Sequence, residues 1–375
     1  MDERAYARAI KPFEAETARL RPTNAEVFDA HTHLGLDEDG RALATEALLA
    51  MLDAAGARRA CVFPLHDPER VPAYRVPNDR VLRWAEESSG RLVPYCRLDP
   101  ADGAVREGER ALAAGARGIK LHPRAQTFAF EGQDIAQIFA LADQAAVPIL
   151  IHAGRGMPPI ADGLADLALR HPNVVLILAH AAIADQGILT TRLADHPGVL
   201  YDVSCFYPLD VLELFARVPA ERIVFASDPP YGHPATSLYM ALRIAAALEL
   251  DETAVRLFLG GTMGALCDGR GLPAPLAPRG SGTITMSGPM ARVYSYCATS
   301  GPALFGGQTE IVRGSLELAR AACRDPEPPD HLGPALEQIA SALSTAIASA
   351  EDLVDALPTL DLIHRCMSLA ATETA

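Results

Sequence analysis

The chain has 375 residues, 49% of them hydrophobic, and a formal net charge of −14. A chain this acidic is a poor candidate for binding nucleic acid or an anionic membrane through its bulk charge. No uninterrupted apolar run approaches the ~18 residues of a membrane span, and the charged N-terminus lacks the apolar segment of a secretory signal. We therefore expect a soluble, cytoplasmic protein that binds neither nucleic acid nor membrane.

The cysteines argue against a disulfide framework and against a cysteine zinc site. They are odd in number, widely scattered and never arranged as CxxC. Such usage suits a chain kept in a reducing compartment. The seven are Cys61, Cys96, Cys205, Cys267, Cys297, Cys323 and Cys366.

An alternation of strand-like and helix-like segments begins near residue 26, after an arm over 1–25 that is predicted to contain some helix. Apolar, β-branched runs are separated by alanine- and leucine-rich amphipathic segments. The predicted strands are 26–33, 58–64, 91–98, 117–123, 147–153, 173–181, 198–204 and 222–228. Helices are predicted between them, for example over 45–57, 104–116, 134–146 and 235–250.

This alternation predicts βαβ units and a parallel sheet. The strands are apolar almost throughout, which indicates burial on both faces, as helices covering a parallel sheet require. Eight units match a closed barrel, whereas an open doubly wound sheet would usually carry a glycine-rich phosphate loop that this sequence lacks. The predicted fold is α/β, a (β/α)8 TIM barrel over residues 26–267 with a C-terminal helical extension.

A linker rich in Gly and Pro is predicted over 268–283, and the helical extension over 284–375. Within the extension, helices are predicted over 309–323, 334–357 and 359–374. The stretch 284–307 carries no motif that indicates a structure. The extension can form a hairpin or bundle, cover an apolar barrel face, or pair two chains. A homodimer through the barrel or the tail is therefore an expectation.

Polar side chains capable of binding a metal lie at the ends of several predicted strands. In a TIM barrel, the active site forms at the C-terminal ends of the strands. Because each of these residues follows an apolar run, we expect them to meet at one end of the barrel. They are His31, His33, Lys120, His122, His152, His180, Asp202, Ser204 and Asp228.

This set of residue types favours a divalent cation. A buried cluster of imidazoles without a metal would need many compensating hydrogen-bond partners. Several nitrogen ligands with one carboxylate suit Zn²⁺ best, and Mn²⁺, Fe²⁺ or Co²⁺ are alternatives. Asp202 is a candidate acceptor that orients a histidine ligand.

The ordered motifs HxH, KLHP, IHAG, LAHA and SDPP resemble the amidohydrolase superfamily, over about residues 26–266. The resemblance is greatest to its amidohydrolase-related (amidohydrolase 2) branch of metal-dependent hydrolases and decarboxylases. It implies that His31, His33, His152 and Asp228 bind the metal. It implies that His180 binds a second metal or acts on the water and the substrate.

Lys120 and His122 are ambiguous within this resemblance. In binuclear relatives a lysine on strand 4 is carboxylated and bridges two metals, and Lys120 lies on that strand. Relatives in this branch often carry KLHP with a single metal. We favour one ion, with Lys120 as a plain amine, and keep both residues as possible ligands of a second metal or of the substrate.

Three further residues are candidates for binding a small-molecule substrate. Arg124 follows strand 4 and Arg155 follows strand 5, so either can hold a carboxylate by a bidentate contact. Each can equally be solvated or paired with a surface acid. His66 follows strand 2 and can line the pocket.

Metal-dependent hydrolysis is the reaction that these residues predict. A metal-activated water would attack an amide, ester or lactone carbonyl, with Asp228 taking the proton and His180 acting on the tetrahedral intermediate or as acid and base. The alternative is a non-oxidative decarboxylase, a C–C lyase, of a small carboxylic acid. A third possibility is an inactive barrel that serves as a binding protein, but the presence of every metal-binding motif argues against it.

Overall fold

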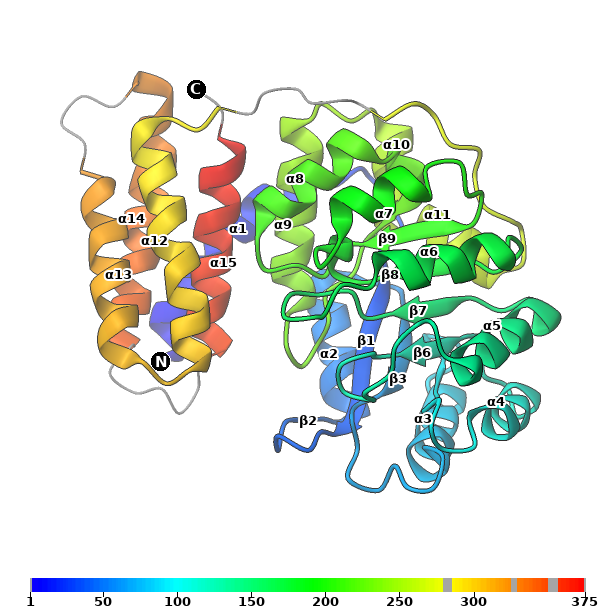
Figure 1. Ribbon diagram of the computed structural model, residues 1–375. Coiled ribbons are helices and arrows are strands. Elements are labelled where there is room, and N and C mark those ends of the chain that lie inside the picture. The colour runs from blue at the N-terminus through cyan, green and yellow to red at the C-terminus, as the bar shows by residue number, and fades with distance from the viewer. Residues whose placement is uncertain (1, 279–284, 325–328, 350–356, 374–375) are drawn as a thin grey trace.

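Parallel strands close into a barrel in the computed structural model, which describes residues 2–278, 285–324, 329–349 and 357–373 (Figure 1). The neighbouring strands pair in parallel around the barrel. The ring closes where Ala30 N–H donates to Phe225 O at 2.9 Å. The strands are β1 (Phe28–Leu36), β3 (Arg59–Pro64), β4 (Leu92–Pro94), β5 (Cys96–Arg97), β6 (Ile119–Leu121), β7 (Ile149–Ile151), β8 (Leu176–Leu178), β9 (Val199–Asp202) and β10 (Ile223–Val224). The predicted TIM barrel is confirmed.

The predicted strand 91–98 appears as two short pieces, β4 and β5, that are halves of one barrel strand. Tyr95, between them, donates its N–H to Val62 O of β3 at 2.8 Å, and Cys96 donates to Gly118 O beside β6 at 2.9 Å. The strand therefore pairs with one neighbour and then with the other. A two-residue strand, β2 (Ala42–Leu43), was not predicted and pairs antiparallel with the end of β1.

Side chains alternate between two apolar regions along each strand. On β7, Leu150 faces the barrel interior, while Ile149 and Ile151 face the surrounding helices. This alternation follows from the period of two along a strand. The interior is filled by Phe28, Ala30, Cys61, Phe63, Tyr95, Leu150, Ile177, Ala179, Leu200, Val224, Ala226 and Met263.

Helices surround the barrel, including four at the predicted positions 45–57, 104–116, 134–146 and 235–250. They are α2 (Thr45–Ala55), α3 (Arg75–Glu87), α4 (Ala104–Ala113), α5 (Gln133–Ala145), α6 (Ala161–Arg170), α7 (Gln186–Arg192), α8 (Pro208–Arg217), α9 (Pro234–Ala247), α10 (Glu252–Arg256) and α11 (Thr262–Cys267). Short turns of helix lie at η1 (His180–Ala182), η2 (Ala220–Arg222) and the π-helical η3 (Leu257–Gly261). Among the described residues, no helix is long and apolar enough to cross a membrane.

The C-terminal helices form a bundle beside the barrel, and the N-terminal helix joins it (Figure 1). Its elements are α1 (Glu3–Leu20), α12 (Gly288–Phe305), α13 (Thr309–Ala322), η4 (Asp330–Leu332), α14 (Gly333–Ser349) and α15 (Leu357–Thr372). Every residue of α15 from Thr359 to Thr372 is buried. A helix buried on all sides is a core element, and α15 packs against α12, α14 and the barrel helix α9.

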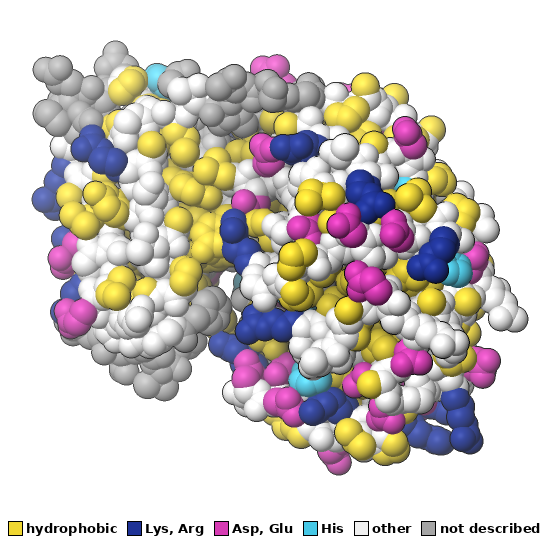
Figure 2. All heavy atoms as spheres, in the orientation of Figure 1, with side chains coloured by type: hydrophobic (Ala, Val, Ile, Leu, Met, Phe, Trp, Pro, Cys, Tyr) yellow, Lys and Arg dark blue, Asp and Glu magenta, His cyan; other side chains and the backbone are white. Residues whose placement is uncertain are grey.

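Polar contacts tie this bundle to the barrel. Asp361 of α15 accepts hydrogen bonds from Tyr6 Oη of α1 at 2.6 Å and from Thr236 of α9. Arg243 of α9 pairs with Glu16 of α1 at 2.8 Å. In Figure 2, apolar side chains gather where the bundle meets the barrel, and basic side chains lie among acidic ones over the barrel face.

The predicted extension differs from the structure in one helix. α12 lies within 284–307, where no element was predicted, while α13, α14 and α15 match the predicted helices. Residues 350–356 of the predicted helix 334–357, and 279–283 of the predicted linker, lie outside the described residues. The predicted arm over 1–25 is mostly one helix, α1, which packs on α9, α14 and α15.

Candidate metal centre

An irregularity in β1 aims its two histidines into the barrel. Phe28 and Ala30 face the interior, so a regular strand would turn His31 and His33 outward. The pairing register with β3 shifts between Asp29 and Thr32, and such a bulge re-aims the side chains that follow it. Asp29 braces this segment, because its Oδ1 accepts the N–H groups of His31 at 3.1 Å and Ser227 at 3.0 Å.

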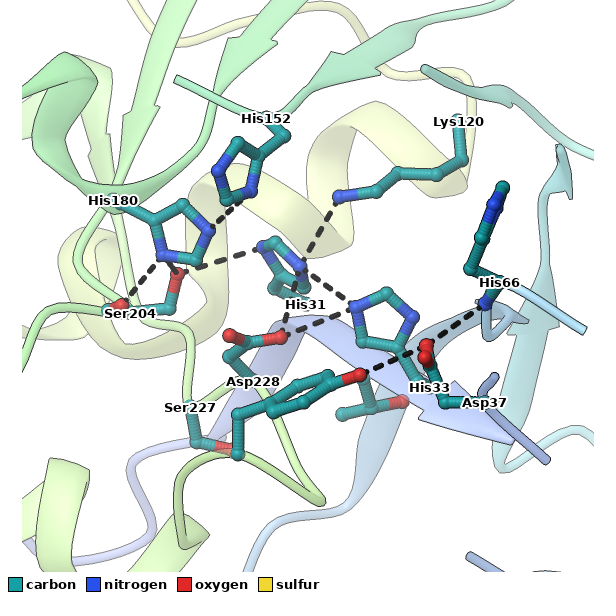
Figure 3. Close-up of polar contacts among 12 residues, drawn as sticks. His31, His33, Asp37, His66, Lys120, His152, His180, Ser204, Ser227 and Asp228 are labelled. Carbon is teal, nitrogen blue, oxygen red and sulfur yellow. Dashed lines mark hydrogen bonds and ion pairs between the residues drawn. The ribbon is translucent and has the colours of Figure 1, made fainter. Parts of the chain in front are cut away.

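Three ligand atoms converge at the end of β1. His31 Nε2 lies 3.2 Å from His33 Nε2. Asp228 Oδ1 lies 3.2 Å from the first of these atoms and 3.1 Å from the second. Figure 3 shows the two imidazoles and the carboxylate turned toward one another. The segment after β10 supplies Asp228 at a left-handed backbone position, φ 59°, which aspartate tolerates better than most residues.

Asp202 fixes the orientation of the His31 ring. Its Oδ2 lies 2.8 Å from His31 Nδ1, and because a carboxylate only accepts, Nδ1 carries the proton and Nε2 presents its lone pair to the centre. Asp202 Oδ1 accepts the backbone N–H groups of His180 at 2.9 Å and Ser204 at 3.0 Å. The single carboxylate therefore braces three residues of the site.

His180 completes a second group of ligand atoms. One atom each from His31, His180 and Asp228 lies within 4.8 Å of the others. His180 Nδ1 donates to Ser204 O at 2.8 Å, so its Nε2 is left to accept. Three successive residues from His180 have positive φ angles of 58°, 55° and 53°. Such strained backbone is typical of functional sites.

His152 and His122 lie beside this group as a stacked pair. Their ring centroids are 3.8 Å apart with planes 11° from parallel. His152 Nδ1 lies 3.0 Å from His180 Nε2, which places His152 next to the converging atoms. Burial lowers the pKa of both His122 and His152. Both are therefore neutral imidazoles, the form that binds metals.

Lys120 reaches the centre from β6. Its Nζ lies 3.2 Å from His31 Nε2 and 4.6 Å from the centre of the Phe63 ring. The side chain is fully buried. Burial lowers the pKa of Lys120 to about 7, so the amine is far easier to deprotonate than an exposed lysine.

These residues fit a divalent cation. Asp228 Oδ1 is buried and, despite its two imidazole neighbours, makes no hydrogen bond, and His33 Nδ1 has no partner among the described residues. Burial lowers the pKa of His33 to about 3, so its ring is neutral. Ligands about 2.0–2.1 Å from one tetrahedral Zn²⁺ lie about 3.3–3.4 Å from one another. The three observed spacings of 3.1 to 3.2 Å are close to this distance between ligands.

Two cavities meet at this centre, and Asp228 lines both. One, of about 660 Å³, is bounded by His180, Phe206 and, from the bundle, Gly301 and Pro302. The other, of about 480 Å³, is bounded by His33 of β1, His66 and Arg97. Cavities of this size hold small molecules.

The three predicted substrate-binding residues border these cavities, and they differ in exposure and in the contacts that hold their side chains. Arg124 is exposed and borders both. Arg155 also borders both, but it pairs with Asp210 at 2.7 Å and stacks over Tyr207. His66 borders the smaller cavity, with Nδ1 accepting from the Tyr74 hydroxyl. Each therefore borders the space where the sequence predicted a substrate.

Other cavity residues were missed by the sequence analysis. Arg97 of β5, and Tyr231 just after Asp228, border the smaller cavity. The period of two puts Arg97 on the same face of the predicted strand as Tyr95, but which face points inward is known only from the structure. Gly301 and Pro302 had no signal in the sequence, because they belong to the unpredicted helix α12.

The comparisons with known proteins agree with this arrangement. A family model described as amidohydrolase (amidohydrolase 2) matches residues 28–262, more than half of the chain. A search of curated proteins finds no match. Similar solved structures share the barrel at low identity, so they show the fold alone.

Three of these structures illustrate the likeness. An IDCase from Metarhizium anisopliae in apo form has 14% identity and a TM-score of 0.53, over 66% of this chain and 98% of that one. A 2,6-dihydroxybenzoate decarboxylase from Rhizobium has 14% identity and a TM-score of 0.50, over 66% of this chain and 99% of that one. An amidohydrolase from Burkholderia multivorans has 15% identity and a TM-score of 0.52, over 66% of this chain and 100% of that one. A family model matches the whole barrel, and the group of His31, His180 and Asp228 at its mouth could hold a metal, so the chain belongs to the amidohydrolase family.

Proposed function

We propose that the protein is a metal-dependent hydrolase that acts on an amide, ester or lactone carbonyl of a small molecule. The observation that carries this proposal is the convergence of His31 Nε2, His33 Nε2 and Asp228 Oδ1 beside two cavities. We propose one ion, Zn²⁺ before Mn²⁺, Fe²⁺ or Co²⁺, because nitrogen ligands predominate. His152 remains a proposed fourth ligand.

A bound divalent cation supplies two things to such a site: it acidifies a water and polarises the substrate carbonyl. Asp228 is the residue that takes up the proton. Burial opposes its ionisation, but His31 and His33 outweigh burial and hold its pKa well below the ordinary value. Asp228 is thus an ionised acceptor at neutral pH, and it lines both cavities.

His180 is the second proposed catalytic residue. Its Nδ1 proton is committed to Ser204 O, so Nε2 is the atom that can accept a proton or, once protonated, donate one. The ring lines the larger cavity beside Asp228. Burial lowers the pKa of His180, which favours the neutral, proton-accepting form at the start of the reaction.

Non-oxidative decarboxylation of a small carboxylic acid is the second candidate. The basic side chains of Arg97, Arg124 and Arg155, which line the smaller cavity, favour an anionic substrate. The same centre would then bind the substrate carboxylate, with a nearby acid protonating the carbon that loses CO₂. The metal-binding residues are common to both reactions and do not separate them.

The test is a substrate screen of the zinc-loaded protein with lactones, amides, esters and aromatic carboxylates. The proposal expects release of a carboxylic acid from a lactone, amide or ester, and loss of at least about 10²-fold in kcat/KM for Asp228→Asn. The matched control, Asp162→Asn, changes an exposed carboxylate that pairs with Arg192 away from both cavities and should keep most of the activity. Release of CO₂ alone would select the decarboxylase, and no turnover of any compound by the metal-loaded protein would contradict both.

A further inference from the structure

Arg97 is a charged side chain built into the barrel wall. It lies at the end of β5, in register with Lys120 of β6, and is almost entirely buried, with 2% exposure. Asn78 of α3 holds its backbone from both sides, accepting the Arg97 N–H at 2.9 Å and donating to the Arg97 carbonyl at 3.1 Å. The position of Arg97 is therefore fixed by the scaffold.

The guanidinium of Arg97 has no counter-ion within the part of the chain that the structure describes. Its Nη1 donates to Pro64 O at 3.2 Å, and Nη2 lies 3.5 Å from His66 Nδ1, at the outer limit of a hydrogen bond. Its Nε is buried and has no hydrogen-bond partner among the described residues, and its Cζ lies 5.3 Å from the centre of the Tyr74 ring. Among the described residues, no carboxylate lies within 4.0 Å of it to form an ion pair.

The acids that share this cavity are engaged elsewhere. Asp37 Oδ2 accepts the Tyr231 hydroxyl at 2.9 Å and the backbone N–H of His66 at 3.1 Å. Asp39 pairs with Arg41, and Asp228 belongs to the candidate metal centre. An arginine keeps its charge at any physiological pH, and a buried charge without a partner is unfavourable. A fixed, buried guanidinium with no counter-ion among the described residues therefore has the properties of a ligand-binding group.

The cavity connects Arg97 to the candidate metal centre. Arg97, His33 and Asp228 line the same space of about 480 Å³. We propose that Arg97 anchors a carboxylate of the substrate while the reacting group lies at the metal centre. The planar guanidinium suits a carboxylate, which can accept two parallel hydrogen bonds. This inference rests on the proposed function and narrows its substrates to small molecules that carry a carboxylate remote from the reacting group.

The test uses succinate, glutarate and adipate, each compared with its monoamide, in calorimetric titrations of the zinc-loaded protein. We expect the best-binding diacid to bind about tenfold or more tightly than its monoamide, because one charge-assisted contact is lost. In Arg97→Met, the preference should fall to within about twofold, and Arg97→Lys should retain part of it. Arg217→Met, which removes an exposed arginine of α8, is the matched control and should behave as wild type.

Several outcomes would overturn the inference. These are a wild-type protein that binds diacid and monoamide equally, an undiminished preference in Arg97→Met, and an equal loss of preference in Arg217→Met. Thermal unfolding separates this role from a structural one: removal of an unpaired buried charge should leave the Tm of Arg97→Met unchanged or raise it. If that variant does not fold, Arg97→Lys decides, since an unchanged preference there contradicts the proposal.

Titrations of the chelator-treated protein keep the two proposals distinguishable. Contact between a carboxylate and Arg97 needs no bound metal, so the apoprotein should still bind diacids more weakly when Arg97 is replaced by Met. A protein that binds no metal yet keeps this dependence would refute the proposed function alone. A protein that binds zinc but shows no dependence on Arg97 would refute the anchor alone.

Discussion

A single carboxylate organises the candidate metal centre at the residue scale. Asp202 accepts the Nδ1 proton of His31 and the backbone N–H groups of His180 and Ser204. It therefore fixes a tautomer and positions a neighbouring segment at the same time. Its own pKa is lowered, because His31 and His180 outweigh the effect of burial. An ionised acceptor at this position makes His31 a stronger metal ligand.

Asp202→Asn should weaken the affinity for Zn²⁺ by about 10–100-fold, because a neutral amide is a poorer acceptor for the His31 Nδ1 proton. The measurement is a competition titration against a zinc chelator. Asp210→Asn is the control and should stay within about twofold of wild type, since Asp210 pairs with Arg155 at the rim. An Asp202→Asn protein with wild-type affinity would show that this contact does not tune the site.

At the residue scale, the sequence predicted which side chains lie together wherever the ends of strands could be located. His31, His33, His180 and Asp228 do meet, because parallel strands of a barrel end at the same rim. Arg97 was missed, since a lone arginine in an apolar run resembles a surface residue until the inward face of its strand is known. Which imidazole nitrogen faces the centre depends on partners such as Asp202, which lies 171 residues from His31.

At the scale of elements, local breaks in regular structure decide how the site forms. The register shift in β1 turns His31 and His33 inward. Strict alternation within 26–33 cannot show this, because Phe28 and Ala30 already occupy the interior. The unpredicted α12 has a related cause. Its two Gly-Pro pairs signal breaks, yet Pro289 lies in the first turn, where proline is tolerated, and Pro302 lies in the last.

The helix α15 joins the bundle to the barrel through a buried seam with α9. His364 of α15 lies 3.3 Å from Met240 Sδ of α9, with its ring 5.1 Å from Phe206. Burial lowers the pKa of His364 to about 4. An unfolded chain has a histidine pKa near ~6.5, so it binds more protons than the folded chain between these values. The stability that His364 confers is complete above pH ~6.5 and decreases as the pH falls toward 4.

Lowering the pH from 7.5 to 5 should therefore cost about 2 kcal/mol of unfolding free energy through His364 alone. Urea unfolding at both pH values measures this. His364→Leu should show a smaller pH dependence than wild type by about that amount. Ser344→Ala, a change of a residue that does not titrate at an exposed position of α14, should keep the pH dependence of wild type. Equal pH dependence in wild type and His364→Leu would contradict a buried neutral imidazole at this seam.

At the scale of the whole molecule, the C-terminal bundle forms part of the barrel mouth. Gly301 and Pro302 of α12 line the larger cavity together with His180 and Phe206. A Cβ atom at Gly301 would lie 2.6 Å from Phe206 Cε1, so the absence of a side chain allows the close approach. The division of the chain into an arm, barrel, linker and extension stays a prediction, as do a homodimer and a cytoplasmic location.

Gly301→Ala should move the Phe206 ring and narrow the larger cavity. We expect a loss of about 1–3 kcal/mol in stability from overpacking, with a larger fall in kcat/KM for bulky than for small substrates of the series identified by the screen. Gly314→Ala on α13 is the matched control, because a Cβ there meets nothing within 4 Å, and it should be neutral or stabilising by up to ~1 kcal/mol. If the two variants behave identically, the bundle does not form part of the substrate site.

The central claim is that His31, His33 and Asp228 hold one divalent metal. The most direct test is the metal content of the purified, chelator-rinsed protein after incubation with zinc, measured by mass spectrometry. We predict about one equivalent in wild type and in Lys120→Ala, and little or none in His31→Ala. Two equivalents that fall to one or none in Lys120→Ala would favour a bridging lysine. Undiminished metal in His31→Ala, or no metal in the wild-type protein, would contradict the account.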